Sequence, residues 1–440
     1  MVRCQGGNVR VREFPILGDE DAQTVEAFAT GLDREAARVL AYLVGREESD
    51  RFSGEAASRL AVRVGVDLGR GRVSDVLGTL TDLGLVVETT VDSEAPGRPP
   101  KGWRADAGHD RTLARVRTLH ADALLDQAAT VASTLDDDFE SSARPRPTGD
   151  TTAPPPADRD AGHVAVGLNW EPNGLHAPLF AGAYADHGVD VTLTGRRGSR
   201  AALSSVADGD VDVGLTGAAT YLRACTNGDV VPLALYYQRA MVTLYTTRSA
   251  FGGPLRSVED VRGRRVAMPA GSETGALGRL FLAQAGVVDD VTVVRADGEE
   301  REALLDGDAD VATGVFTDPL ELEATGHDVD SVLLADHFPV PGPAFVVRPE
   351  TLRERPDALR GFLEGAMAGW TAARADPAAA VAALPDDAAD AADERRKLDG
   401  AFERFAGGDA VEKNGWGWHS PETWERLRVA LEQAAALGSP

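Results

Sequence analysis

A stretch of twenty residues with little capacity to fold divides this 440-residue chain in two. Residues 141–160 read SSARPRPTGDTTAPPPADRD, with five prolines and no leucine, isoleucine, valine or aromatic residue. Such a segment cannot bury enough apolar surface to offset the entropy that it loses on ordering. We therefore expect a linker over 139–160, with independent cores on either side, in a chain long enough for two or three domains.

The charge balance limits what the chain can bind. It carries 70 acidic against 45 basic residues, a net charge of −25, and its only lysines are Lys101, Lys397 and Lys413. This acidic, lysine-poor composition is typical of halophilic proteins adapted to molar salt, and GC-rich coding DNA is the alternative explanation. So negative a chain is not a general binder of nucleic acids or anionic membranes, and any DNA contact must come from a local patch.

The sequence contains no sign of export or of metal chemistry. No run approaches the roughly 20 apolar residues that span a bilayer, and residues 1–20 lack the apolar core of a signal peptide. We therefore expect a cytoplasmic protein. Cys4 and Cys225 lie far apart without partners at metal-ligand spacing, so we expect two free thiols, no metal and no cofactor.

The front part predicts a helical unit that ends in a hairpin. The expected elements are helices at 33–44, 54–64 (capped by Ser53) and 72–83, a strand at 85–91, a turn at 95–100 and a short strand at 102–104. This order is that of a winged helix-turn-helix domain, which we place at 20–106.

The segment RVSDVLGTLTDLGLVVETTVDSEAPGRPPKGWRAD (72–106) resembles winged-helix transcription regulators, including archaeal TrmB-type ones. Charge supports DNA binding independently, because residues 51–120 carry 11 basic and 9 acidic side chains while the rest of the chain is strongly acidic. Two arginines open the expected recognition helix and three cations lie on the wing. The candidate DNA-binding residues are Arg70, Arg72, Arg98, Lys101 and Arg104. The alternative is a winged helix that uses these residues as solvated surface in protein–protein contact.

A longer helix is expected at 108–138. Its apolar residues are spaced to form one stripe: Leu113, Val116, Leu119, Leu124, Val131 and Leu135. Such a stripe after a winged helix favours a homodimer, and packing back onto its own domain explains the stripe nearly as well.

The rear part, 161–440, alternates strands with helices. Short buried strands are expected at 163–168, 211–216, 264–269, 291–296, 310–316 and 343–348. This alternation predicts an α/β fold with mostly parallel sheets. The run from Gly198 to Gly214 resembles the type II periplasmic-binding-protein fold. That resemblance implies two lobes, the first at about 161–245 and 340–440 and the second at about 246–339, with a ligand between them at strand ends.

Within that superfamily, residues 168–193 resemble the thiamine-pyrimidine branch, which contains hydroxymethylpyrimidine phosphate synthases and precursor-binding transport proteins. The matching residues are Asn169, Trp170, Pro172, His176 and Pro178. An indole and an imidazole can stack on a flat heteroaromatic ring, and an amide can read the ring's edge. The alternatives are core packing for the tryptophan and a structural hydrogen bond for the histidine.

A second element, MPAGSETGALGRL (268–280), resembles the phosphate-binding turn of the same family. A glycine-rich loop that enters a helix presents N–H groups to an anion, although alone it indicates only a tight turn. The resemblance implies ligand contacts at Ser272, Thr274 and Gly275, and at strand ends or helix starts in Ser199, Thr216, Thr220 and Asp318.

Departures from the synthases favour binding over catalysis. Thr216 and Thr220 stand where the synthases carry a lysine and a histidine that act on pyridoxal phosphate, and no lysine occurs from 102 to 396. The cysteine cluster linked to iron use is absent from 337–347. We therefore expect a regulator of thiamine biosynthesis in a haloarchaeon, not an enzyme, that binds operator DNA and a thiamine-related pyrimidine or its phosphate. The alternatives are a variant synthase, a sensor of another small anion such as a sulfonate, and a transport-binding protein.

Overall fold

The computed structural model describes residues 16–91, 99–135, 162–224, 229–385 and 390–437. The chain forms two compact units, one of residues 1–120 with 412–415 and one of residues 121–411 with 416–440. Arg98, Cys4, Cys225 and the expected linker lie outside the described residues. Within the described residues, no helix has both the length and the apolar character needed to cross a membrane.

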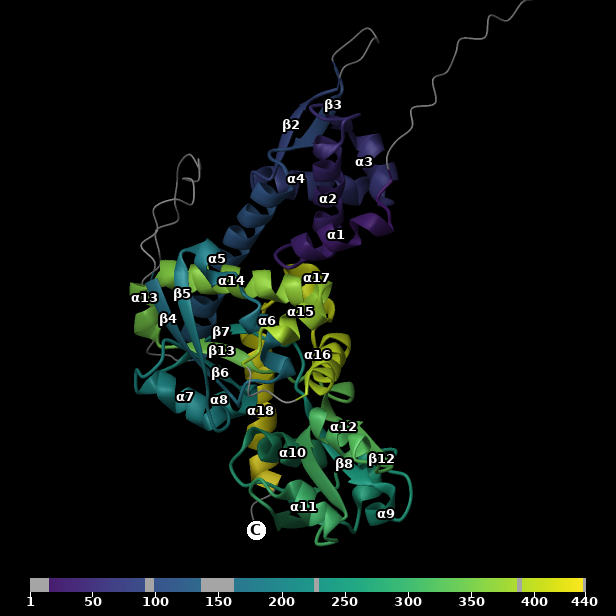
Figure 1. Ribbon diagram of the computed structural model, residues 1–440, viewed down its shortest axis with the longest axis vertical. Helices are drawn as coiled ribbons and strands as arrows, with labels where there is room; N and C mark the ends of the chain where they lie inside the picture. Colours follow the sequence, from purple (N-terminus) through teal and green to yellow (C-terminus); the bar gives the residue numbers. More distant parts are fainter. Residues whose placement is uncertain (1–15, 92–98, 136–161, 225–228, 386–389, 438–440) are drawn as a thin grey trace, which may run out of the picture. The chain divides into compact units, whose positions relative to one another are not determined.

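The front unit contains helices and one small antiparallel sheet (Figure 1). Its elements are η1 (Asp19–Asp21), α1 (Ala22–Ala29), α2 (Arg34–Glu48), β1 (Ala57–Ser58), α3 (Arg59–Val66), α4 (Arg70–Asp82), β2 (Val86–Thr90) and β3 (Lys101–Ala105). The strand order is β1-β3-β2, and Trp103 pairs with both Ala57 and Glu88. The expected helices over 33–44 and 72–83 correspond to α2 and α4.

The start of α3 differs from the expectation. Ser53 does not cap this helix, because Ala57 and Ser58 are held as strand β1 against β3. The cap is Ser58, whose Oγ accepts from the Ala61 amide at 3.2 Å. The helix ends at Asp67, a non-glycine residue with φ of 52°, so the chain turns sharply before α4.

Helix α5 (His109–Leu135) carries the stripe that favoured a dimer. In the front unit its Val116 is fully buried, with Leu113 and Leu119 packed on the same core. In the rear unit Leu124 and Val131 are fully buried in the cores of that unit. The described stripe residues therefore pack within their own chain. The first part packs on the front unit, as in the alternative explanation, and the later part packs on the rear unit, which neither explanation predicted. Dimerisation of the whole chain stays a prediction.

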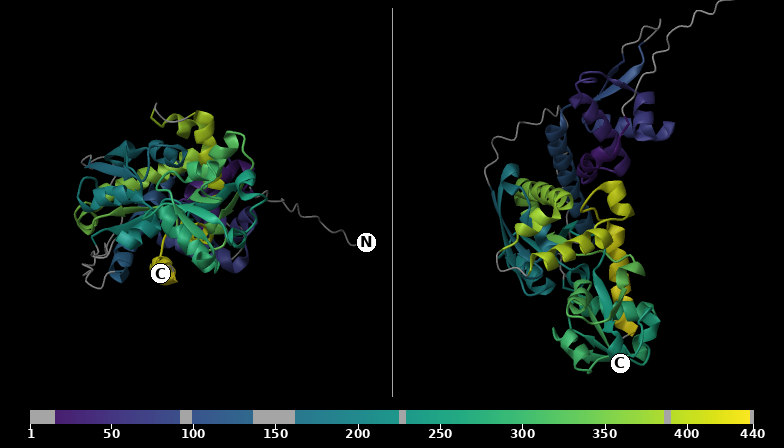
Figure 2. Two further views of the ribbon diagram at one scale, coloured as in Figure 1. Left: turned by 90° about the horizontal axis from the view of Figure 1, so that it is seen from below. Right: turned by 45° about the vertical axis from the view of Figure 1, so that its right-hand side comes forward.

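The rear unit is built on two five-stranded sheets of the same topology (Figures 1 and 2). The first comprises β4 (Gly162–Leu168), β5 (Val189–Gly195), β6 (Val213–Thr216), β7 (Val231–Leu235) and β13 (Ala344–Val347), in the order β5-β4-β6-β13-β7. The second comprises β8 (Val242–Thr247), β9 (Arg265–Met268), β10 (Thr292–Arg295), β11 (Val311–Val315) and β12 (Val329–Leu333), in the order β10-β9-β11-β8-β12.

Each sheet has one strand that runs against the other four. In the first sheet it is β13, and in the second it is β8. Each of these strands is the first to enter its sheet after the chain has crossed from the other lobe. The sequence expectation of two α/β lobes with mostly parallel sheets is confirmed. The expected lobe boundary at 245 falls inside β8, however, because the chain crosses between Leu235 and Val242.

Helices cover the sheets and connect the lobes. They are α6 (Ala177–Phe180), α7 (Ser199–Ala207), α8 (Ala218–Ala224), α9 (Arg248–Phe251), α10 (Glu273–Gln284), α11 (Glu300–Leu305), α12 (Thr317–Ala324), α13 (Pro349–Glu354), α14 (Pro356–Ala375), α15 (Pro377–Ala382), α16 (Ala391–Phe405), α17 (Asp409–Asn414) and α18 (Pro421–Leu437). Helix α18 packs on α8 of the first lobe and on α10 of the second. Its Trp424 is fully buried and donates to His419 Nδ1 at 3.0 Å, so this helix joins the two lobes.

Candidate functional site

The carboxyl end of β4 brings together two of the predicted ligand residues. Asn169 follows the strand directly, and its Oδ1 lies 3.0 Å from Nε2 of His176, the last residue of η2 (Gly174–His176). The histidine is 3% exposed, and burial lowers its pKa to about 4. The ring is therefore neutral near pH 7, and Nε2 donates because an amide oxygen only accepts. This contact leaves the amide NH₂ of Asn169 available as a donor.

Trp170 is next to this pair in sequence and is 58% exposed. An indole this exposed is not core packing, so the structure rejects that alternative for Trp170. A large exposed aromatic side chain at a strand end is a surface on which a flat ring can stack. The exposure and the strand-end position are what a ligand-contacting residue requires.

The loop that carries these residues is held by buried groups from distant segments. The carbonyl oxygen of Leu175 accepts from the hydroxyls of Tyr236 at 2.9 Å and Tyr237 at 3.0 Å. The Gly174 amide donates to the carboxylate of Glu394, which is 1% exposed. Because its supporting groups are buried and paired, the loop is preorganised for contact with a ligand.

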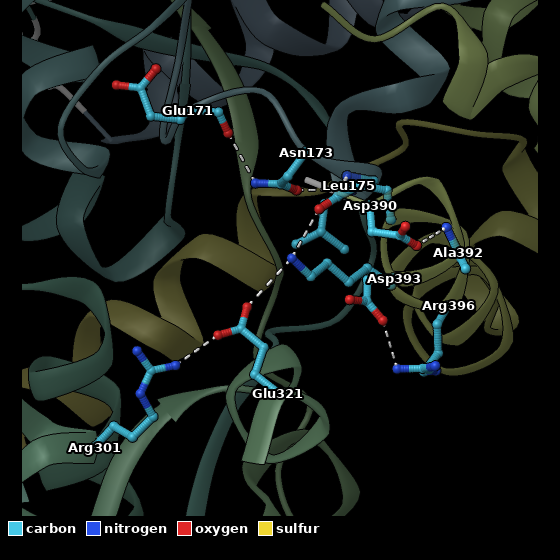
Figure 3. Close-up of polar contacts among 12 residues, drawn as sticks. Glu171, Asn173, Leu175, Arg301, Glu321, Asp390, Ala392, Asp393 and Arg396 are labelled. Atoms are coloured by element: carbon cyan, nitrogen blue, oxygen red, sulfur yellow. Dashed lines mark hydrogen bonds and ion pairs between the residues drawn. The ribbon is translucent and has the colours of Figure 1, made fainter. Parts of the chain in front are cut away.

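An ion-pair network extends from this loop to the second lobe (Figure 3). Lys397 Nζ on α16 lies 3.1 Å from Glu394 Oε1 and 3.4 Å from Glu321 Oε1, and Glu321 pairs with Arg301 at 2.9 Å. The lysine side chain is 15% exposed. Its burial acts to lower the pKa, but the two carboxylates outweigh this effect, so the pKa of Lys397 is raised. Such a lysine stays protonated and is a poor nucleophile.

The residues predicted at the other strand ends form hydrogen bonds that join neighbouring backbone segments. Ser199 Oγ, at the start of α7, accepts from the Gly217 amide at 3.0 Å. Thr216, fully buried at the end of β6, donates its hydroxyl to the Ser199 carbonyl at 3.1 Å. These contacts join α7 to the turn after β6. They give both side chains a structural role.

Thr220 lies where the lobes meet. Its backbone amide donates to Oε2 of Glu273 at 2.6 Å, and the Ala219 amide donates to Oε1 at 3.1 Å. Glu273 is the first residue of α10, so a carboxylate of the second lobe pairs with the first turn of α8 in the first lobe. Glu273 was not predicted from the sequence. An acidic residue inside an expected anion-binding turn was the available signal.

The glycine-rich turn at 268–280 bonds one of its backbone donors within the turn. Ser272 caps α10, its Oγ accepting from the Gly275 amide at 3.0 Å, and its hydroxyl lies 3.0 Å from that of Thr274. A Cβ at Gly275 would lie 2.0 Å from the Pro269 carbonyl oxygen, so this glycine is required for packing. The described contacts thus favour the tight-turn explanation over an anion site.

Asp318 is also directed at the backbone. Its Oδ2 accepts from the Val315 amide at 2.8 Å, and a Cβ at Gly314 would meet the same oxygen at 2.0 Å. Burial raises the pKa of Asp318 to about 6. This carboxylate closes the turn between β11 and α12, and its predicted ligand contact stays a prediction. Among the described residues, no three His, Cys, Asp or Glu side chains are grouped to hold a metal.

In the front unit, most described candidates for DNA contact are paired with carboxylates. Arg72 pairs with Glu35. Lys101 lies 2.7 Å from Glu88 on the neighbouring strand, and Arg104 lies 4.0 Å from Glu47. All three cations have side chains more than 40% exposed. Exposed pairs of this kind contribute only about 0–1 kcal/mol, so a phosphate group could displace the carboxylate.

Three arginines around the α3–α4 turn form no ion pair within the described residues. Arg59 and Arg63 are exposed one turn apart on α3, and Arg70 is exposed at the start of α4. Arg63 and Arg70 line a hollow of about 460 Å³ together with Val64, Asp67, Leu68 and Gly69. Arg70 was predicted from the sequence, whereas the two arginines on α3 were not.

Comparisons with known proteins concern the rear unit. Residues 175–380 match the family described as NMT1/THI5 like. The riboflavin-binding protein RibY of Chloroflexus aurantiacus is 24% identical over 321 residues, which covers 67% of this chain and 89% of that protein. A solved structure from Bordetella bronchiseptica RB50 is 18% identical with a TM-score of 0.49, covering 61% of this chain and 89% of its own. The periplasmic aliphatic sulphonate binding protein SsuA of Escherichia coli is 13% identical with a TM-score of 0.48, covering 64% and 95%.

The rear unit therefore has an assigned class. Its two sheets of equal strand order define the two-lobed periplasmic-binding-protein fold. Within that class, residues 175–380 are similar to the NMT1/THI5-like family.

Proposed function

We propose that this chain is a ligand-responsive transcription regulator whose front unit is a winged helix that binds operator DNA. The observation that carries this proposal is the element order of the front unit. A helix, a short strand, two helices across a tight turn and a two-stranded hairpin follow one another, with all three strands in one sheet. In this arrangement α4 enters the major groove and the β2–β3 hairpin is the wing.

The rear unit binds a small molecule, for which we propose a thiamine-related pyrimidine such as hydroxymethylpyrimidine or its phosphate. Support comes from the NMT1/THI5-like match and from the exposed Trp170 beside the Asn169–His176 pair. The indole stacks on the ring and the Asn169 amide donates to an acceptor on its edge. Because the histidine is neutral, binding should not depend on imidazole charge between pH 5.5 and 7.5.

We further propose that the chain is a cytoplasmic sensor and not an enzyme. Thr216 and Thr220 occupy the positions where the synthases carry reactive groups, and both side chains are buried. Lys397, which lies near the loop after β4, is paired with two carboxylates and so stays protonated. Product formation from pyridoxal phosphate and iron would contradict this part of the proposal.

The regulatory step is closure of the two lobes on the ligand, which changes the affinity of the front unit for DNA. It requires a ligand with different affinities for two states of the chain. A homodimer would double the DNA contact and help to compensate for molar salt, in which the Debye length is about 3 Å.

The test uses the full chain in high-salt buffer. Duplexes retained from a random library are sequenced, and calorimetry measures binding of hydroxymethylpyrimidine, its phosphate, thiamine and thiamine diphosphate. Micromolar binding of one pyrimidine, with a ligand-dependent change in affinity for an enriched duplex, supports the proposal. A chain that enriches no duplex is not a DNA-binding regulator, and ligand binding without any change in DNA affinity excludes the coupling.

A second candidate ligand is a flavin. RibY, the relative at 24% identity, is named a riboflavin-binding protein, and the three-ring isoalloxazine offers a larger surface to Trp170. Riboflavin therefore belongs in the same calorimetric panel, as does a sulfonate, since SsuA is named a sulphonate binding protein. Riboflavin affinity above that of the pyrimidines would favour a flavin sensor.

A further inference from the structure

We infer that Glu273 determines ligand specificity in the rear unit by accepting hydrogen bonds from a ligand with amino or ring N–H groups and by repelling an anionic ligand at the same place. This inference rests on the proposed function, because it refines the chemical class of the small molecule. It concerns a residue to which the sequence assigned no role.

The position of the carboxylate follows from two hydrogen bonds that cross between the lobes. Glu273 is the first residue of α10 in the second lobe, and its two oxygens accept from the amides of Ala219 and Thr220 in the first lobe. Gly217 lies directly against it, since a Cβ there would fall 2.2 Å from Glu273 Cδ. The glycine therefore makes room for a carboxylate at the junction of the lobes.

This carboxylate lies at the same sheet edge as the proposed ring contacts. Strands β4 and β6 are parallel neighbours in which Gly167 pairs with Gly214. Two residues further along, each strand reaches its carboxyl end, at Asn169 and Thr216. Glu273 lies against Gly217, the residue directly after Thr216. Its carboxylate is therefore at the same sheet edge as Asn169 and Trp170. The Glu273 residue as a whole is partly exposed.

The chemistry of the group decides which ligands fit. A carboxylate has about four acceptor positions, and the two backbone amides use two of them. The rest suit donors such as an exocyclic amine. A sulfonate or phosphate placed there would meet a like charge, and the first turn of α8 already has an anionic partner. Burial raises the pKa of Glu273, whereas the bonds from Thr220 and Ala219 and the charge of Arg223 act in the opposite direction.

The experiment compares the parent chain with Glu273→Gln, which keeps the shape and one acceptor oxygen but removes the charge. Calorimetry on the full chain uses 4-amino-5-hydroxymethyl-2-methylpyrimidine, the same ring without the amino group, and ethanesulfonate. Glu323→Gln, on the exposed side of α12, is the matched control. Thermal unfolding of all three chains checks that each is folded.

We expect the parent chain and the control to prefer the amino pyrimidine by about 10- to 100-fold, the range for a hydrogen bond to a charged group. Glu273→Gln should reduce that ratio to within about threefold, and ethanesulfonate should bind only to this variant, if to any. An unchanged ratio in Glu273→Gln, or ethanesulfonate binding to the parent chain, overturns the inference.

Failure of the proposed ligand gives a different result. If neither pyrimidine binds the parent chain, the pyrimidine assignment fails, and ethanesulfonate binding then tests the role of Glu273. Ethanesulfonate binding to Glu273→Gln alone supports the inference that Glu273 excludes anions. Ethanesulfonate binding to the parent chain, or to none of the chains, overturns that inference.

Discussion

The two units place their polar residues differently. In the front unit the candidate DNA contacts are long, exposed cations, which pair with surface carboxylates or with nothing among the described residues. In the rear unit most of the predicted residues are short polar side chains that are buried or half-buried, and several of them bond to the backbone at strand ends and helix starts. An exposed pair exchanges its partner at little cost, whereas a buried polar group holds one geometry. The front unit thus has cations whose partners can be exchanged, while the rear unit holds its polar groups in fixed positions.

The largest effect we expect comes from breaking the buried network of the rear unit. Glu394→Ala removes the acceptor of the Gly174 amide and one of the two carboxylate partners of Lys397, which keeps Glu321. An unsatisfied buried amide and a weakened buried ion pair should together cost about 3–4 kcal/mol of unfolding free energy. Urea unfolding of the full chain measures this loss. Glu350→Ala is the control, because Glu350 and Arg353 form an exposed pair at 3.0 Å on α13, and its loss should be within about 1 kcal/mol. Equal losses would contradict the contrast between buried and exposed pairs.

Acid should destabilise the rear unit through two buried histidines. Burial lowers the pKa of His176 and of His419 to about 4, below the unfolded value of 6.5. The unfolded chain therefore binds more protons than the native chain between pH 6.5 and 4. The resulting stability is complete above pH 6.5 and is lost as the pH falls to 4, by about 3 kcal/mol for each histidine.

Unfolding free energies measured at pH 7.5, 5.5 and 4.5 test this sign. His419→Gln should show a shallower dependence on pH than the parent chain. Asp318, whose pKa of about 6 is raised by burial, acts in the opposite direction between pH 4 and 6. In Asp318→Asn the loss on acidification should therefore be steeper. A parent chain that gained stability on acidification would show that the histidines do not dominate.

The next effect concerns ligand affinity. Trp170→Ala should weaken pyrimidine binding by about 10- to 100-fold, since stacking on an aromatic side chain contributes about 1–3 kcal/mol per base. The free energy of unfolding should change by less than about 1 kcal/mol, because the indole is 58% exposed. Calorimetry and urea unfolding of the same variant separate the two quantities. A large loss of stability with unchanged affinity would assign the residue to packing.

The smallest effect is expected in the front unit, where single charges act additively. Arg63→Ala and Arg70→Ala should each lower the slope of log affinity against log salt by about 0.9 if each arginine contacts one phosphate. Arg72→Ala should have a smaller effect, because its pairing with Glu35 has to be broken first. Fluorescence anisotropy on an enriched duplex measures the slopes. Arg353→Ala in the rear unit is the control. If it lowers the slope as much as Arg63→Ala does, the arginines around the α3–α4 turn do not form a local DNA-binding surface.

Much of the fold could be predicted from local pattern. The helical period over 33–44 and 72–83 predicted α2 and α4, and short apolar runs predicted β4, β6, β9, β10, β11 and β13. The cap of α3 could not be placed this way. Ser53 and Ser58 are equivalent as sequence signals, and pairing of Ala57 with Trp103, 46 residues later, selects Ser58.

By itself, the sequence determined the two-lobed α/β class of the rear part and the strand-end loop with Asn169, Trp170 and His176. It placed the division of the chain at 139–160, whereas the two compact units divide between residues 120 and 121. These features depend on composition, periodicity and neighbouring residues, which the chain carries locally. Only the tertiary structure decided that Glu273 meets Ala219 and Thr220, and that Lys397 and Glu394 support the loop after β4. The hydrogen bonds among those contacts join residues 53 to 220 positions apart. Their free energy comes from burial and charge pairing between elements, which no local pattern encodes.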